Sequence, residues 1–104
     1  MKTKEMQISR LAHNIMGAGT IVKGEISTSE DFRIDGIIEG NVICKGKVVL
    51  GPQASITGNI TCSEADLMGK MNGNLDVQGK LIFRSSLILN GDLSVQKLEI
   101  EPGA

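Results

Sequence analysis

The stretch Gly40-Asn41-Val42-Ile43-Cys44 decides the fold, because four other stretches of the chain repeat its pattern. In each stretch a glycine precedes a polar residue and then an apolar one, and another apolar or small residue follows two positions later. The other copies begin at Gly24, Gly58, Gly73 and Gly91, so successive glycines are 16, 18, 15 and 18 residues apart. A repeat of this length is typical of a stacked array, in which no single unit can bury its own apolar side.

Apolar residues recur at equivalent positions of every unit and alternate with polar residues, which predicts strands with side chains pointing alternately into and out of the array. Five inward columns follow: Phe32, Val48, Ala65, Leu81, Leu98; Ile34, Leu50, Leu67, Phe83, Ile100; Val22, Ile38, Ile56, Met71, Leu89; Ile26, Val42, Ile60, Leu75, Leu93; and Thr28, Cys44, Cys62, Val77, Val95. We therefore expect an all-β, single-domain fold: a triangular parallel β-helix, or solenoid, of about five to six windings with three short strands each. An outward column of Asn41, Asn59 and Asn74 is expected to form hydrogen bonds along the stack.

The extent of the repeat predicts the domain organisation. Residues 1–19 do not share the repeat and are expected to form a flexible N-terminal tail. Residues 20–104 are expected to form the β-helix domain. Its last winding is expected to be incomplete, because residues 97–104 parallel residues 47–54 and then stop at the corner.

Composition argues against several classes of protein. A net charge of −1, two aromatic residues and no basic stripe give no reason to expect nucleic-acid binding. There is no run of 18 apolar residues and no apolar segment of the kind that signal peptides carry, so a cytoplasmic location is expected. The two cysteines fit neither a disulfide framework nor a zinc pattern.

The residues needed for enzyme chemistry are missing from the repeat. His13 is the only histidine and precedes the first unit, whereas acyltransferases and zinc-dependent carbonic anhydrases built on left-handed β-helices need histidines as base or ligands. Cys44 and Cys62 are interpreted as small apolar core residues, since valines occupy the same column in the next units. No phosphate-binding loop occurs. We expect a protein that is not an enzyme, with no catalytic residue, no metal site and no cofactor or nucleotide.

A solenoid has two terminal windings with unpaired backbone groups and an open core, and the sequence shows no amphipathic segment long enough to cover them. The predicted function is self-assembly by stacking these ends into filaments. At the C-terminal end, the residues expected to drive assembly are Leu81, Phe83, Leu93, Val95, Leu98 and Ile100. At the N-terminal end they are Ile21, Val22 and Ile26.

The N-terminal tail combines apolar and basic residues. The sequence predicts a weak contact with a membrane surface, effective only when many tails act together in a polymer. The residues expected to make it are Met1, Lys2, Lys4, Met6, Ile8, Arg10 and Leu11. A tail without such a function is the alternative interpretation.

The segments 32–42, 46–51 and 56–60, and above all Arg-Ile-Asp-Gly-x-x-Glu-Gly-Asn at residues 33–41, resemble the bactofilins. The resemblance covers residues 20–104. It implies a right-handed triangular β-helix that polymerises without nucleotide into non-polar filaments, through head-to-head and tail-to-tail contacts. It also implies a bacterial cytoskeletal role in cell shape and local cell-wall organisation, beside the inner face of the cell membrane and with cell-wall enzymes as partners. The unequal repeat lengths and the usual hand of parallel crossovers favour the same right-handed sense.

An alternative function is a monomeric β-helix that docks a cell-wall enzyme or another partner through a flat face. A degenerate enzyme subunit is a third interpretation, which would need a second chain to supply the missing histidines.

Overall fold

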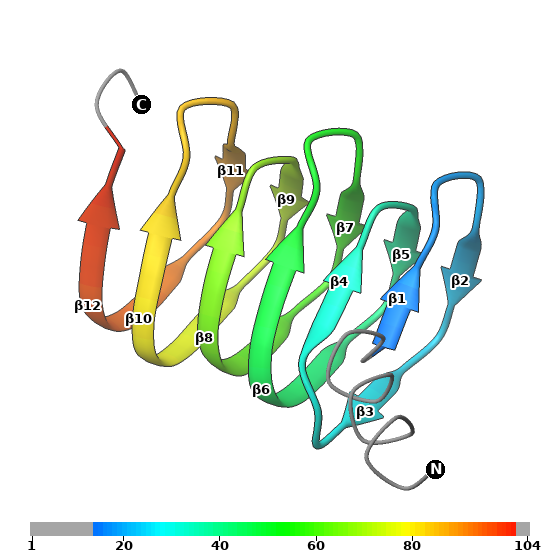
Figure 1. Ribbon diagram of the computed structural model, residues 1–104, viewed down its shortest axis with the longest axis horizontal. Coiled ribbons are helices and arrows are strands. Elements are labelled where there is room, and N and C mark those ends of the chain that lie inside the picture. Colours follow the sequence, from blue (N-terminus) through cyan, green and yellow to red (C-terminus); the bar gives the residue numbers. More distant parts are fainter. Residues whose placement is uncertain (1–13, 102–104) are drawn as a thin grey trace, which may run out of the picture.

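The computed structural model describes residues 14–101, in which twelve short strands follow one another with no helix among them (Figure 1). The strands are β1 (Asn14–Met16), β2 (Ile21–Lys23), β3 (Ile26–Thr28), β4 (Phe32–Ile34), β5 (Ile37–Glu39), β6 (Val42–Leu50), β7 (Ser55–Thr57), β8 (Ile60–Leu67), β9 (Lys70–Asn72), β10 (Leu75–Phe83), β11 (Ile88–Asn90) and β12 (Leu93–Ile100). Every pair of neighbouring strands is parallel.

The strands form three faces of a triangular tube, because the longer strands β6, β8, β10 and β12 bend around one corner and contribute to two faces. The ladders slip by a residue at that bend, as between Cys44 and Lys47 of β6. Face 1 comprises β3 and the first parts of the four long strands, face 2 comprises β1, β4 and the last parts of the long strands, and face 3 comprises β2, β5, β7, β9 and β11. Among the described residues, face 2 thus has six strand segments, whereas faces 1 and 3 have five each.

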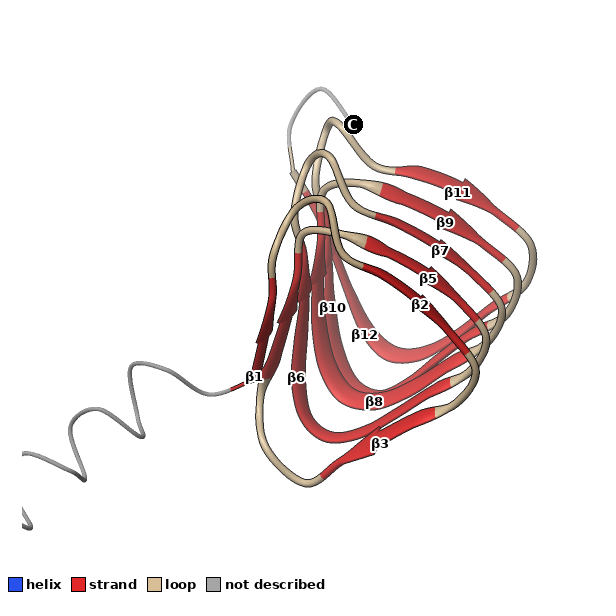
Figure 2. Ribbon diagram, turned by 90° about the vertical axis from the view of Figure 1, so that its right-hand side faces the viewer, coloured by secondary structure: helices blue, strands red, loops and turns tan. Residues whose placement is uncertain are grey.

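Two views fix the hand of the solenoid. In Figure 1 the face 2 segments run upward in front, the chain turns back at the top, and face 3 descends behind. Figure 2, seen from the N-terminal end, shows the chain running clockwise as it recedes, which is the right-handed sense. The predicted all-β solenoid is confirmed, with five full windings and a sixth segment on face 2.

The predicted columns form the core, with their predicted register. Cys44 pairs with Cys62, and Val48 with Ala65, each inward residue lying directly on its equivalent in the next winding. Ile34, Ile38 and Leu50 have no exposed surface. Each such side chain contributes about 1.5–3 kcal/mol by leaving water, so the stacked aliphatic columns are the main source of stability.

The repeat glycines allow the windings to stack at the corner between faces 3 and 1. Gly40 has φ of +151°, in the region that favours glycine, and a Cβ at this position would overlap the carbonyl oxygen of Gly24. Gly58, Gly73 and Gly91 each meet the preceding glycine in the same way. The spacing that reveals the repeat in the sequence is therefore set by close backbone contact.

One sequence-based boundary is wrong. The absence of the repeat places residues 14–16 in the N-terminal tail, but they form β1 and pair in register with β4. The repeat pattern does not reveal this strand, because its first inward position is the polar Asn14 and no repeat glycine precedes it. Residues 14–16 therefore belong to the β-helix.

Candidate functional site

The windings of the tube resemble one another along its length. The surfaces that could bind another molecule are therefore its two ends, where the stacking stops, and its three outer faces. Within residues 14–101, no group of three or more His, Cys, Asp and Glu side chains could hold a metal ion. In the same part of the chain, no helix is long and apolar enough to cross a membrane.

Cys44 and Cys62 are buried thiols in the core, as predicted. The Cys44 Sγ donates a hydrogen bond to the backbone carbonyl of Glu30 at 3.1 Å. Burial raises the pKa of Cys62 to about 12, which disfavours the nucleophilic thiolate. Both residues therefore act as small core side chains.

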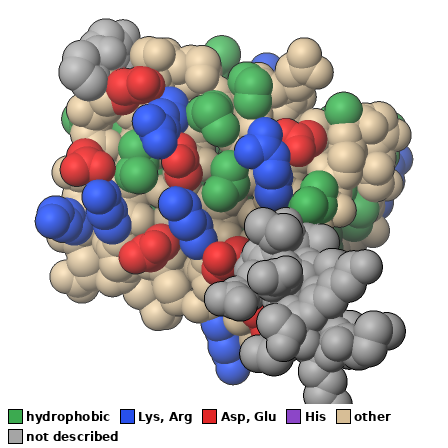
Figure 3. Space-filling view, in the orientation of Figure 1, with side chains coloured by type: hydrophobic (Ala, Val, Ile, Leu, Met, Phe, Trp, Pro, Cys, Tyr) green, Lys and Arg blue, Asp and Glu red, His purple; other side chains and the backbone are tan. Residues whose placement is uncertain are grey.

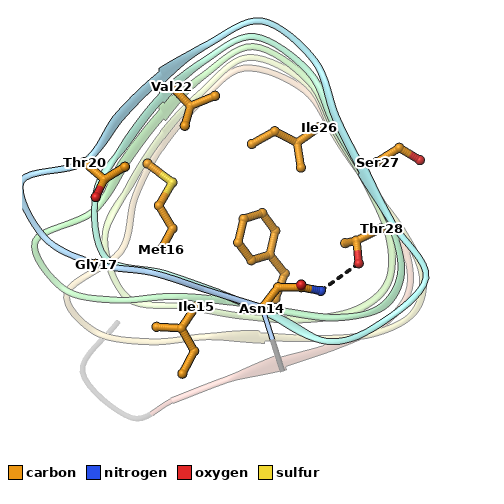
Figure 4. Close-up of a pocket in the computed structure, with 10 residues that line it drawn as sticks. Asn14, Ile15, Met16, Gly17, Thr20, Val22, Ile26, Ser27 and Thr28 are labelled. Atoms are coloured by element: carbon orange, nitrogen blue, oxygen red, sulfur yellow. Dashed lines mark hydrogen bonds between the residues drawn. The ribbon is translucent and has the colours of Figure 1, made fainter. Parts of the chain in front are cut away.

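The N-terminal end holds a cavity of about 620 Å³, where the first winding has no neighbour among the described residues (Figure 4). Met16, Val22 and Ile26 point into it, and Phe32 also lines it. Its polar side is formed by Asn14, whose Nδ2 donates to Thr28 Oγ1 at 2.8 Å. Two columns that are mostly apolar further along the stack thus begin with a hydrogen-bonded polar pair.

The structure separates the three predicted N-terminal assembly residues. Val22 and Ile26 are half-buried and line the cavity. Ile21 instead points outward on face 3, is 59% exposed, and lies beside Ile37 in register. Only Val22 and Ile26 therefore belong to the open end of the core.

The C-terminal end is formed by the last winding, whose inward side chains have no cover among the described residues. Leu98 is 44% exposed and Ile100 is 57% exposed, although both occupy core columns. Phe83, Leu93 and Val95 are half-buried against the same core. The sequence also predicts Leu81 at this surface, but it is fully buried beneath Leu98 and supports the end from the layer below.

An ion-pair network ties the last winding to the two before it. Arg84 donates two hydrogen bonds of 2.8 Å to the carboxylate of Asp66, and its Nη1 lies 3.9 Å from Glu101 Oε1. The Ser85 backbone N–H donates to Glu101 Oε2 at 2.8 Å. The Arg84 hydrogen bonds lower the pKa of Asp66, although the partial burial of this carboxylate opposes the shift.

The sequence pattern does not predict this network, because Asp66 falls in a mixed outward column and Arg84 falls in a corner 18 residues later. One signal could have found the pair. Asp66 lies in register with Ile82, and Arg84 follows Ile82 by two residues, just beyond the end of β10, so an acidic and a basic side chain fall in neighbouring windings.

Face 2 mixes charged and apolar side chains in successive windings (Figure 3). Its central outward column reads Ile15, Arg33, Val49, Asp66, Ile82 and Glu99. Besides the Asp66–Arg84 pair, the face carries an Arg33–Asp35 pair at 2.9 Å and a Lys80–Glu99 pair at 3.0 Å. Two of these ion pairs, Asp66–Arg84 and Lys80–Glu99, link neighbouring windings, and the charged side chains interrupt the apolar ones along the face.

The predicted asparagine column makes hydrogen bonds along the stack. The backbone N–H of Asn59 donates to Asn41 Oδ1 at 3.1 Å, and that of Asn74 donates to Asn59 Oδ1 at 3.2 Å. These contacts link successive windings at the glycine corner.

The tail residues predicted to contact a membrane lie outside the described residues. They are Met1, Lys2, Lys4, Met6, Ile8, Arg10 and Leu11.

Comparison with known proteins bears on the function of this tube. The bactofilin family, described as polymer-forming cytoskeletal, matches residues 14–104. Among curated proteins, the chain is 23% identical over 100 residues to bactofilin BacO of Myxococcus xanthus, covering 96% of this chain and 79% of that protein. It is 22% identical over 102 residues to bactofilin BacP of the same species, covering 97% of this chain and 42% of BacP.

A solved structure has a similar fold. The crystal structure of a mutant bactofilin from Thermus thermophilus superposes with a TM-score of 0.77 at 24% sequence identity. The superposition covers 85% of this chain and 98% of the other.

Proposed function

The chain belongs to the bactofilin family, and on this premise we propose that it is a structural scaffold that assembles end to end into filaments. The observation that supports the proposal is that the apolar core is open at both ends of the described tube. Core side chains are exposed at the C-terminal end, and a cavity opens into the core at the N-terminal end. Burying these surfaces against other copies is favourable in water, since each buried apolar side chain contributes about 1.5–3 kcal/mol.

Strand edges provide a second reason for assembly. β1 and β12 are the outermost strands of the larger sheet, each with a row of backbone groups that no described strand covers. Such edges are templates for pairing with another chain. Like ends would meet like ends, head to head and tail to tail, and the filament would be non-polar and independent of nucleotide.

The proposed setting is the cytoplasm of a bacterial cell, at the inner face of the membrane. There the filament would support cell shape and organise cell-wall enzymes. It performs no chemistry itself in this proposal, in keeping with the buried thiols of Cys44 and Cys62.

Negative-stain electron microscopy and light scattering over a range of protein concentrations, without nucleotide, test assembly. Long thin filaments and scattering that rises above a threshold concentration are expected. Dispersed single particles at every concentration would contradict the proposal and favour the monomeric docking function.

A further inference from the structure

The backbone groups and side chains at the C-terminal end restrict how a second copy can bind there. Face 2 is the only face with six strand segments among the described residues, and its last segment, residues 98–100, is also the last strand of the chain to be described. Because a solenoid rises continuously, this segment stands further along the axis than the ends of the other faces. A second copy approaching the C-terminal end would therefore meet residues 98–100 first.

The free backbone groups of this edge can be assigned. The Glu101 N–H donates to the Phe83 carbonyl of β10 at 2.9 Å, so Glu101 faces the preceding winding. Successive residues of a strand direct their N–H and C=O groups to opposite edges, so those of Glu99 also face β10. The N–H and C=O groups of Leu98 and Ile100 then point away from the body, along the open edge.

The side chains around Glu99 are arranged symmetrically. Leu98 and Ile100 flank it with exposed apolar side chains. One position further out, Lys97 lies on one side and Glu101 on the other, with opposite charges. No ion pair involves Lys97 within residues 14–101, whereas Glu101 keeps its contacts with Arg84 and Ser85.

Resting on the proposed end-to-end assembly, we infer that two copies join their C-terminal ends about a two-fold axis through Glu99, with residues 97–101 of each paired antiparallel. Leu98 of one copy and Ile100 of the other then exchange both backbone hydrogen bonds, and their side chains close the core. Lys97 of each copy lies opposite Glu101 of the other, which forms two equivalent ion pairs. The two Glu99 carboxylates meet at the axis, each neutralised by Lys80 of its own chain at 3.0 Å.

A head-to-tail contact is less favourable on the same residues. In that arrangement β12 would continue in parallel onto β1 of the next copy. Leu98 would then stack on the polar Asn14, and Glu99 would lie beside Ile15. In the same register Glu101 would lie beside Gly17, and residues 14–17 carry no charge, so Glu101 would gain no ionic partner among them. The antiparallel contact pairs Leu98 with Ile100 and Lys97 with Glu101, and leaves the two Glu99 carboxylates as the only like charges that meet, each beside the Lys80 of its own chain.

Charge reversal in two separate chains tests the two-fold axis. Lys97→Glu alone and Glu101→Lys alone each place like charges opposite each other twice, so each should raise the threshold concentration for assembly by about tenfold. A 1:1 mixture of the two variants restores opposite charges at both positions, so the threshold should return towards the wild-type value. A mixture that behaves as the average of its components would overturn the inference.

A cysteine at the axis provides a test that does not depend on the charge-reversal variants folding. Directly opposed residues that do not exchange hydrogen bonds have Cα atoms about 4.5 Å apart, within the range of a disulfide. Glu99→Cys should therefore give disulfide-linked dimers under mild oxidation with a small disulfide reagent. The matched control is Asp76→Cys, which is exposed on face 1 but lies in β10, between β8 and β12, and should remain unlinked.

The outcomes distinguish the inference from the proposed function. If wild-type protein assembles but Glu99→Cys does not cross-link and the mixture is not rescued, the two-fold register is wrong and assembly stands. If wild-type protein does not assemble at any concentration, the proposed function itself fails.

Discussion

The two ends of the solenoid differ in how they leave the core open. At the N-terminal end the core is concave and partly polar, with Asn14 bonded to Thr28 beside the cavity. At the C-terminal end Leu98 and Ile100 are exposed, and charged residues surround them. The difference indicates that the two ends would form contacts of different strength and different sensitivity to salt.

The largest effect is expected from placing a charge in each open end. Leu98→Arg should block the C-terminal contact and leave dimers joined by their N-terminal ends, and Ile26→Arg should leave dimers joined by their C-terminal ends. The double variant should be monomeric. Size-exclusion chromatography with light scattering measures these masses, and unchanged filaments from either single variant would remove that end from the proposal.

The second prediction concerns the ion-pair network found towards the C-terminal end. Arg84→Met leaves the carboxylate of Asp66, whose side chain is 12% exposed, without its partner, so stability should fall by about 1–3 kcal/mol. Thermal unfolding followed by circular dichroism measures the loss. The control is Arg33→Met, which breaks the more exposed Arg33–Asp35 pair and should change stability by less than about 1 kcal/mol. Equal losses in the two variants would contradict a special role of the network.

The third prediction is that the Asp66–Arg84 pair makes the stability of the fold depend on pH in acid. The folded-state pKa of Asp66 is lowered from 3.8, chiefly by its hydrogen bonds from Arg84. A lowered pKa gives stability that is fully present above the unfolded-state value and is lost as pH falls through the folded-state value. Unfolding in urea at decreasing pH should show this loss below pH of about 4. Asp66→Asn should show a smaller dependence on pH over that range, and an identical dependence would refute the assignment.

The smallest effect is expected at the polar side of the N-terminal cavity. Asn14→Ala removes the hydrogen bond to Thr28 and should cost about 0.5–1.5 kcal/mol, since that side of the cavity is open to water. A double-mutant cycle with Thr28→Val isolates this contact by urea unfolding. A coupling free energy near zero would show that the pair contributes nothing to closing the first winding.

The columns of the core can be predicted from the sequence because side chains alternate inward and outward along each strand. Since the windings also stack in register, each inward position must hold a side chain that packs on its equivalents in the neighbouring windings. The apolar pattern assigns Ile34, Leu50 and Leu67 to one column, and all three are fully buried in it. The start of the fold cannot be predicted in this way, since Asn14 breaks the apolar column that it begins.

The polar contacts of the ends are harder to predict. The Asp66–Arg84 pair joins residues 18 positions apart in windings whose ladder shifts register, so spacing along the chain does not give distance in space. The exposure of Leu98 depends on what lies beyond it, and column membership alone cannot show that. Repetition therefore predicts the interior well and the ends poorly, because the ends are where repetition stops.

Within residues 14–101, face 2 has one strand segment more than each of the other two faces, and its first and last segments belong to the outermost strands described. Subunits joined through these segments would be held along a single side of the rod at every junction. The opposite edge would be less constrained, so such a filament would bend more easily in one plane than in the other. A preferred direction of curvature would then arise from the position of the first and last strands, without any hinge in the chain.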